Sequence, residues 1–144
     1  MSREDLILII DDEVQIRRLL EITLQSNGFN ICEAHSGREG INLAASHQPE
    51  LIILDIGLPD ISGHEVLKKL REWYTNPIII LSVQSNEEDI VKALDSGAND
   101  YLVKPFRTGE LLARIRSALR SNNSSEDAKA VFSIAEIEID LVAR

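Results

Sequence analysis

Cysteine is nearly absent from this sequence, which has Cys32 as its one thiol among 144 residues. A single cysteine excludes an intramolecular disulfide and argues against a metal site built from thiolates. Free cysteine is among the most buried residue types, and it persists in reducing surroundings. Because Cys32 lies in an apolar-leaning stretch, we expect a buried thiol in a protein from a reducing compartment.

Long apolar runs are missing as well. A membrane-spanning helix needs about 18 or more consecutive apolar residues, and no run in this sequence approaches that length. Near the amino terminus, Arg3, Glu4 and Asp5 are followed only by the short apolar run 6–10, so no secretory signal peptide is visible. We therefore expect a cytoplasmic protein without membrane insertion.

Positive charge is also scarce. The chain has 15 Lys and Arg residues against 24 Asp and Glu residues, which gives a formal net charge of -9 and a pI of about 4.8. Such an acidic surface repels the phosphate backbone of nucleic acid, so any contact with DNA must come from another segment. With 44% hydrophobic residues, the chain can build the core of one domain and still leave a short extension.

Short apolar runs alternate with amphipathic stretches along the chain. Several runs are rich in Ile and Leu without alternation, which is typical of strands buried on both faces of a parallel sheet. The predicted strands cover residues 6–10, 30–33, 51–54, 78–81 and 101–103, and the predicted helices cover about 16–28, 38–47, 63–73, 86–97 and 108–120. Five strand–helix pairs with right-handed crossovers predict an α/β fold, a flavodoxin-like (βα)5 doubly wound parallel sheet with strand order 2-1-3-4-5.

After the last predicted helix the composition changes. Polar residues dominate 121–128 and predict a linker, and a partly alternating apolar pattern then returns over 132–141. One or two strands with that pattern cannot bury a face alone. We therefore expect one domain over 1–120, a linker over 121–130 and the start of a further domain over 131–144, in a chain that is a fragment of something longer.

Acidic residues follow two of the predicted strands. Asp11, Asp12 and Glu13 come after the first strand, and Asp55 comes after the third. Because these strands are neighbours in the predicted order, the three aspartates should converge at the carboxyl edge of the sheet, where such folds bind ligands. Two carboxylates about 4 Å apart repel by roughly 4 kcal/mol at an effective dielectric near 20. Such a cluster needs a compensating cation, and all-oxygen ligands favour Mg²⁺.

Two more polar residues fall at the same edge of the sheet. Ser82 ends the fourth strand, and Lys104, followed by Pro105, ends the fifth. A hydroxyl and an ammonium group there are placed to contact the oxygens of a phosphoryl group, and carboxylates can form acyl phosphates. A single acid after a strand is more often a helix cap or a solvated charge. The joint pattern argues against chance and predicts that Asp55 accepts a phosphoryl group.

Together these residues resemble the receiver domain of bacterial two-component response regulators, over about residues 6–120. The resemblance implies a phospho-acceptor that assists its own phosphorylation and dephosphorylation, not an enzyme. It implies that Asp55 is the acceptor and that Asp12, Asp55 and the backbone carbonyl of Gly57 bind Mg²⁺ directly. Asp11 would act nearby or through water.

The resemblance also implies roles for residues around the acceptor. Lys104 is similar to the phosphate-binding lysine of the family, and its bond to Pro105 would be cis. Ser82 and Tyr101 resemble the switch pair, in which the hydroxyl moves to the phosphoryl group and the aromatic ring turns inward.

The segments DYLVKPF at 100–106 and ELLARIRSALR at 110–120 resemble the OmpR/PhoB subfamily of DNA-binding transcription factors. Residues 132–144 resemble the first strands of that subfamily's winged-helix domain, whose recognition helix would lie beyond the chain. GLPDISG at 57–63 is similar to the regulators of a potassium-uptake system. The resemblance therefore implies control of potassium transport genes, a sensor histidine kinase that is membrane-bound, and DNA contact only through the missing domain.

A homodimer face is implied on the fourth helix, the fifth strand and the fifth helix. Its residues would be Val91, Leu94, Asp95, Asp100, Leu112, Arg114 and Arg116. The apolar members would form the centre, while Asp100 would pair with Arg114 and Asp95 with Arg116. Surface pairs contribute only about 0–1 kcal/mol each, so they would set orientation more than affinity.

Two positions depart from the family pattern. Val83 stands where a small residue is usual, and its bulk is expected to narrow access to Asp55. Ile90 stands where a basic residue usually pairs with the acid that is Glu110 here. Either Lys92 substitutes for that base, or the pair is lost.

Three other functions stay open at this point. An aspartyl phosphatase of the haloacid-dehalogenase type needs a D-x-D arrangement after the first strand, whereas this chain has Asp11-Asp12-Glu13. A flavodoxin needs a hydroxyl- and glycine-rich phosphate loop there, and an acidic loop would repel phosphate. A degenerate receiver that is never phosphorylated is the third option, and only Val83 points to it.

Residues of other types have simpler interpretations. His35, His47 and His64 show no ligand spacing and are expected at the surface. Trp73 and Tyr74 end a predicted helix and are expected to pack rather than to bind a ligand.

Overall fold

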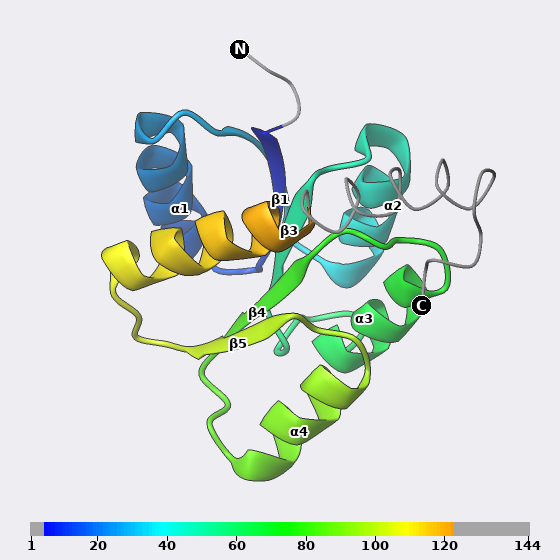
Figure 1. Ribbon diagram of the computed structural model, residues 1–144. Coiled ribbons are helices and arrows are strands. Elements are labelled where there is room, and N and C mark those ends of the chain that lie inside the picture. Colours follow the sequence, from blue (N-terminus) through cyan, green and yellow to red (C-terminus); the bar gives the residue numbers. More distant parts are fainter. Residues whose placement is uncertain (1–4, 123–144) are drawn as a thin grey trace, which may run out of the picture.

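The structure, a computed structural model, describes residues 5–122 and contains one five-stranded parallel sheet (Figure 1). Its strands are β1 (Leu6–Ile10), β2 (Asn30–Ala34), β3 (Leu51–Leu54), β4 (Ile78–Ser82) and β5 (Asp100–Val103). Their order across the sheet is β2-β1-β3-β4-β5, and every neighbouring pair is parallel. The predicted fold and strand order are confirmed, with strand ends that differ by one residue at most.

Helices cover both faces of the sheet (Figure 1). They are α1 (Val14–Ser26), α2 (Gly37–His47), α3 (Gly63–Arg71), α4 (Glu87–Asp95) and a fifth helix over residues 108–122. The first and fifth helices pack on one face, and α2, α3 and α4 pack on the other. This is the doubly wound arrangement that right-handed crossovers produce.

The strands β1, β3 and β4 are apolar on both sides because each side of the sheet has its own core. Ile7 and Ile9 of β1 face the core that contains Leu20 of α1, whereas Leu8 and Ile10 face the core of the other side. Successive side chains of a strand point to opposite faces, so continuous Ile and Leu runs fill two cores at once. The result is a rigid platform whose carboxyl edge presents the polar residues.

Most helix starts follow the usual capping chemistry, but α1 does not. Ser36, Ser62 and Asn86 each accept a hydrogen bond from the backbone N–H three residues later, at the starts of α2, α3 and α4. Glu13 holds the same position before α1, and its side chain makes no capping hydrogen bond. Its carboxylate is therefore available to the site described below.

One histidine expectation is wrong. His35 and His47 are exposed as predicted, but His64 is only 8% exposed. It lies in the first turn of α3, where its Nε2 atom is 3.0 Å from Oδ1 of Asp89 in α4. Its Nδ1 atom is buried without a hydrogen-bond partner among the described residues. Packing between two helices explains the burial, and the spacing of histidines along the chain cannot reveal it.

Other side chains follow their expectations in part. Tyr74 is buried and donates a hydrogen bond to the carbonyl of Pro49 at 2.8 Å, while Trp73 packs edge-on against it but remains exposed. Cys32 is half-buried rather than buried, and burial together with the charge of Glu33 raises the pKa of its thiol to about 11.

The described residues bear on two further expectations, about membrane helices and about the end of the chain. None of the helices within residues 5–122 is long and apolar enough to cross a bilayer. The predicted linker over 121–130, beyond its first two residues, and the predicted domain start over 131–144 lie outside the described residues.

Gly63 allows the close approach between α3 and the end of β3 that shapes the site. A Cβ at this position would meet the backbone of Asp55 and lie 2.5 Å from the Cα of Ile56. We therefore expect Gly63→Ala to lower the free energy of unfolding by about 1–3 kcal/mol, as in other overpacked sites. Urea denaturation measures this. The matched control is Gly109→Ala in the fifth helix, where nothing lies within 4 Å and no loss is expected. Equal losses in the two variants would contradict this account of Gly63.

Candidate functional site

The sheet brings the two acidic loops together. Ile10 and Leu54, the last residues of β1 and β3, are register partners, and the backbone N–H of Asp55 donates to the carbonyl of Ile10 at 3.0 Å. The residues that follow are therefore neighbours. Asp11, Asp12 and Asp55 each offer a carboxylate oxygen, and these oxygens lie within 4.8 Å of one another. The predicted convergence of the three aspartates is confirmed.

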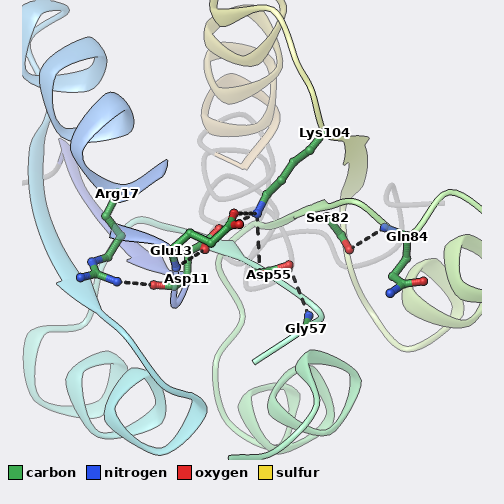
Figure 2. Close-up of polar contacts among 8 residues, drawn as sticks. All are labelled: Asp11, Glu13, Arg17, Asp55, Gly57, Ser82, Gln84 and Lys104. Atoms are coloured by element: carbon green, nitrogen blue, oxygen red, sulfur yellow. Dashed lines mark hydrogen bonds and ion pairs between the residues drawn. The ribbon is translucent and has the colours of Figure 1, made fainter. Parts of the chain in front are cut away.

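Lys104 reaches into this cluster from the loop after β5 (Figure 2). Its Nζ atom lies 3.0 Å from Oδ2 of Asp11, 3.1 Å from Oε1 of Glu13 and 3.8 Å from Oδ2 of Asp55. The lysine side chain is only 7% exposed. Its backbone N–H donates to the carbonyl of Ser82 at 2.8 Å. Lys104 therefore bridges the two acidic loops, and in this conformation it holds Asp11 and Glu13 more closely than Asp55.

The peptide bond between Lys104 and Pro105 is cis, the geometry that the resemblance implied.

Burial and charge set the protonation of these groups. Burial raises the pKa of the Asp11 carboxyl above its usual value, although hydrogen bonds from Glu13 N–H and from Lys104 act against this. Burial and the negative charge of Asp11 raise the pKa of Asp55 in the same way. Burial alone would lower the pKa of Lys104, but its hydrogen bond to Asp11 and the nearby carboxylates hold that pKa above its usual value. The ammonium group of Lys104 thus stays charged, but it does not fully compensate the negative charges of the two buried carboxylates.

The chemistry of this donor set fits a hard divalent cation. Three carboxylates, of Asp11, Glu13 and Asp55, lie near the one ammonium group of Lys104, and Asp12 adds a fourth carboxylate to the cluster. When all of these groups are ionised, the site has an excess of three negative charges. Every candidate ligand atom is an oxygen, as Mg²⁺ prefers. Asp12 is exposed while Asp11 and Asp55 are buried, so the cluster is open to solvent on one side. An ion bound there could keep several of its waters.

Hydrogen bonds from the backbone orient the buried carboxylates. The N–H of Glu13 donates to Oδ1 of Asp11 at 2.9 Å, and the N–H of Gly57 donates to Oδ1 of Asp55 at 3.3 Å (Figure 2). Gly57 therefore lies beside the carboxylate of Asp55, to which its N–H donates. The role predicted for its carbonyl is not addressed by these contacts.

Ser82 and Tyr101 meet at one backbone segment. Ser82 is fully buried, and its Oγ atom accepts a hydrogen bond from the N–H of Gln84 at 3.0 Å. The hydroxyl of Tyr101 donates to the carbonyl of the same Gln84 at 2.7 Å. Val83, which lies between Ser82 and Gln84 in the chain, has a side chain that is 64% exposed. A rearrangement of this segment would therefore affect both members of the predicted switch pair.

Sequence reasoning missed three residues of this site. Glu13 was recognised as an acid after a strand, but not as a partner of Lys104. Arg17 donates to the carbonyl of Asp11, although a basic residue one turn into a helix has no distinctive pattern. Gln84 contributes only backbone atoms to the contacts above, so its side-chain type could not have identified it.

A family comparison decides the assignment. The profile of the response regulator receiver domain matches residues 7–116. The chain belongs to this family.

Individual relatives agree with the assignment. The receiver is 44% identical over 138 residues to the KDP operon transcriptional regulatory protein KdpE of Escherichia coli, covering 96% of this chain and 61% of that protein. It is also 44% identical over 140 residues to KdpE of Mycobacterium tuberculosis, covering 96% and 62%. The chain thus spans about three fifths of the length of these relatives.

A solved structure of similar fold contains a relevant ion. The complex of CheX and CheY with BeF3 and Mg²⁺ from Borrelia burgdorferi contains a chain that matches this receiver with a TM-score of 0.74 and 28% sequence identity. The match covers 78% of this chain and 87% of that chain. The aspartate triad of the receiver is typical of the family's Mg²⁺ site.

Family membership settles the broad function. A receiver domain is the phospho-acceptor part of a two-component response regulator, and its partners are sensor histidine kinases. It is a signalling domain and not a metabolic enzyme. The phosphatase and flavodoxin alternatives are thereby set aside.

The predicted dimer face is partly exposed in the receiver. Val91 and Leu94 of α4 are exposed apolar residues. Arg114 donates to Asp100 at 3.1 Å and to Glu110 at 3.2 Å within the same chain. Glu110 therefore pairs with Arg114 of its own helix rather than with Lys92.

The raised pKa of Asp55 leads to a stability prediction. An acid whose pKa is higher in the folded state contributes stability below its ordinary pKa of 3.8, and that contribution is lost as the pH rises through the folded-state value. We therefore expect Asp55→Asn to unfold roughly 2–6 °C above the wild type at pH 7 in EDTA, because the buried charge is gone. The difference should nearly vanish below about pH 4. Differential scanning calorimetry across this pH range measures it. If the variant is less stable than the wild type at pH 7, Asp55 is not a buried negative charge that Lys104 leaves incompletely neutralised.

Proposed function

We propose that this receiver accepts a phosphoryl group on Asp55 from a sensor histidine kinase, in a reaction that requires Mg²⁺. The observation that carries the proposal is the convergence of three carboxylates within 4.8 Å beside a buried lysine whose Nζ lies 3.8 Å from Oδ2 of Asp55. A nucleophilic carboxylate, a cation site and a phosphate-binding ammonium group are thus adjacent. Those are the parts that phosphoryl transfer needs, because such catalysis is mainly positioning and charge stabilisation.

Asp55 supplies the nucleophile. One of its carboxylate oxygens would attack the phosphorus of a phosphohistidine, and the new O–P bond would form as the N–P bond to the donor breaks. The donor nitrogen leaves with the bonding electron pair, and the product is an acyl phosphate on Asp55.

The carboxylates of the cluster, Asp55 included, would hold the metal ion together with one backbone carbonyl. Asp12, Asp55 and the backbone carbonyl of Gly57 would bind Mg²⁺ directly, with Asp11 nearby or acting through water. When bound, the ion supplies neutralisation of the donor phosphate as it approaches an acidic site.

Lys104 would neutralise part of the negative charge that the phosphoryl group brings to Asp55. Its ammonium group is shared between buried Asp11 and exposed Glu13. The contact with Glu13 is the weaker of the two because that carboxylate is 57% exposed and can be solvated instead. Lys104 would therefore leave Glu13 and bind a phosphoryl oxygen on Asp55.

Ser82 and Tyr101 would transmit the change. The Ser82 hydroxyl would turn to a phosphoryl oxygen and give up the hydrogen bond from Gln84. Because Tyr101 is bonded to the carbonyl of Gln84, its ring would move with that segment. The ring lies in β5, next to α4, where the proposed homodimer face is located. That face comprises Val91, Leu94, Asp95, Asp100, Leu112, Arg114 and Arg116. Phosphorylation would shift the population of conformations toward one in which two such faces pair and form the homodimer.

A KdpE-like role is the finer proposal. The 44% identity to two KdpE proteins supports regulation of potassium transport genes, with a KdpD-like, membrane-bound kinase as donor and a cytoplasmic location. In this proposal residues 1–120 form the receiver, 121–130 the linker and 131–144 the start of a winged-helix domain. Contact with DNA would come from that second domain and not from the acidic receiver.

The acceptor test uses acetyl phosphate with Mg²⁺ and intact-mass spectrometry. The wild type should gain the mass of one phosphoryl group, EDTA should prevent the gain, and Asp55→Asn should gain nothing. Equal gains in the wild type and in Asp55→Asn would reject Asp55 as the acceptor. No gain in the wild type, from acetyl phosphate or from a histidine kinase, would favour the degenerate receiver instead.

A matched variant separates phosphorylation from its readout. Ser82→Ala keeps all the acidic residues, so it should still gain the phosphoryl group but form fewer dimers in analytical ultracentrifugation. Wild-type dimerisation in this variant would exclude Ser82 from the switch.

Val83 gives a prediction about rate. It follows Ser82 at the carboxyl edge of the sheet, where its bulk would narrow access to Asp55, so Val83→Ala should be phosphorylated faster by acetyl phosphate than the wild type. Its side chain is largely exposed, so the substitution should not disturb the core. Stopped-flow measurement of the loading rate tests this, and equal rates would rule out steric control by Val83.

A further inference from the structure

We propose that Arg17 is a positioning residue for the metal site. From the first turn of α1, its guanidinium group ties the peptide bond between Asp11 and Asp12 to β2, and so fixes the direction of both carboxylates. This inference rests on the proposed function, because Mg²⁺ is the ion whose binding Arg17 would govern.

The guanidinium group of Arg17 contacts both the loop after β1 and strand β2, and Figure 2 shows the first of these contacts, the one with Asp11. Its Nη1 atom donates to the backbone carbonyl of Asp11 at 2.7 Å, and its Nε atom donates to Oε1 of Glu33 in β2 at 3.2 Å. The Arg17 side chain is 16% exposed and that of Glu33 is 30% exposed. A planar guanidinium group presents several donors in a fixed fork, so one side chain can hold a carbonyl and a carboxylate at the same time.

The backbone of Asp11 is consequently held on both sides from β2. Its N–H donates to the carbonyl of Ala34 at 3.1 Å, and its carbonyl is held through Arg17 by Glu33, the residue before Ala34. That carbonyl belongs to the planar peptide unit that continues to the N and Cα atoms of Asp12. Holding the oxygen therefore fixes where the chain places Asp12.

Asp12 depends on this support more than its neighbour does. The Asp11 carboxylate has direct partners in the N–H of Glu13 and in Lys104. Within the part of the chain that the structure describes, no group hydrogen-bonds to the exposed carboxylate of Asp12. Only the backbone between β1 and α1 can orient it toward an ion. Residues that orient metal ligands in this way typically change metal affinity by about 10–100-fold when they are replaced.

Charge and position predict opposite results when Arg17 is removed. Arg17 is a cation near a cation site, so its charge alone opposes Mg²⁺, and Glu33 offsets part of that charge. Loss of the charge should tighten Mg²⁺ binding slightly, whereas loss of the clamp should weaken it. The direction of the change in affinity therefore separates a positioning role from an electrostatic one.

The test compares Arg17→Met with Arg18→Met by isothermal titration calorimetry with MgCl2. Arg18 is the next residue of α1 and is exposed, so the two variants lose the same charge from the same helix. We expect Arg17→Met to bind Mg²⁺ about 10-fold more weakly than the wild type, and Arg18→Met to bind it equally or slightly more tightly. Affinity in Arg17→Met equal to or above that of the wild type would overturn the proposal.

Two further measurements keep the result clear. Thermal unfolding in EDTA establishes that each variant is folded at the titration temperature. Arg17→Lys keeps the charge but lacks the fork that holds both oxygens, so it should also bind Mg²⁺ several-fold more weakly. If Arg17→Met does not fold, wild-type affinity in Arg17→Lys overturns the inference. A wild type that binds no Mg²⁺ overturns the proposed function and this inference together, whereas equal binding by all variants overturns the inference alone.

Discussion

The repulsion between the carboxylates of Asp11 and Asp55 is the constraint on which the rest of the site depends. Each directly follows one of two paired strands of the parallel sheet, and the register of β1 with β3 brings their carboxylate oxygens within 4.8 Å of each other. Both are buried and both have raised pKa values. Lys104 supplies one positive charge to a cluster that needs more, which makes the site receptive to a divalent cation. The shared demand for positive charge links the metal site, the lysine and the proposed phosphorylation.

The hydrophobic part of the molecule is what allows this arrangement to persist. Two cores, one on each face of the sheet, stabilise the strands β1, β3 and β4, which are apolar along their length except for Ser82 at the end of β4. That stability offsets the cost of burying charges at the carboxyl edge, a common compromise between stability and function. It also keeps the supporting residues on rigid elements, since Arg17 acts from a helix and Glu33 from a strand.

The architecture could be predicted from the sequence because its signals are local. Short apolar runs and the amphipathic stretches between them identified the five strands and helices, and strand order then brought Asp11, Asp12 and Asp55 together. Side-chain contacts across elements carry no such periodic signal. Lys104 and Glu13 are 91 residues apart in the chain, and their contact depends on loop geometry.

Two other features escaped prediction for related reasons. Gln84 acts through its backbone, which every residue type has in common. His64 is buried by the packing of α3 against α4, and an isolated histidine in an amphipathic stretch does not indicate which helix it will meet.

The most direct test of the central claim is to locate the phosphoryl group on the chain. The protein would be incubated with acetyl phosphate and Mg²⁺, then treated with borohydride, which reduces an aspartyl phosphate to homoserine, and digested for peptide sequencing by mass spectrometry. The account predicts homoserine at position 55 and aspartate at positions 11 and 12. Reduction at position 11 or 12, with position 55 intact, would contradict it.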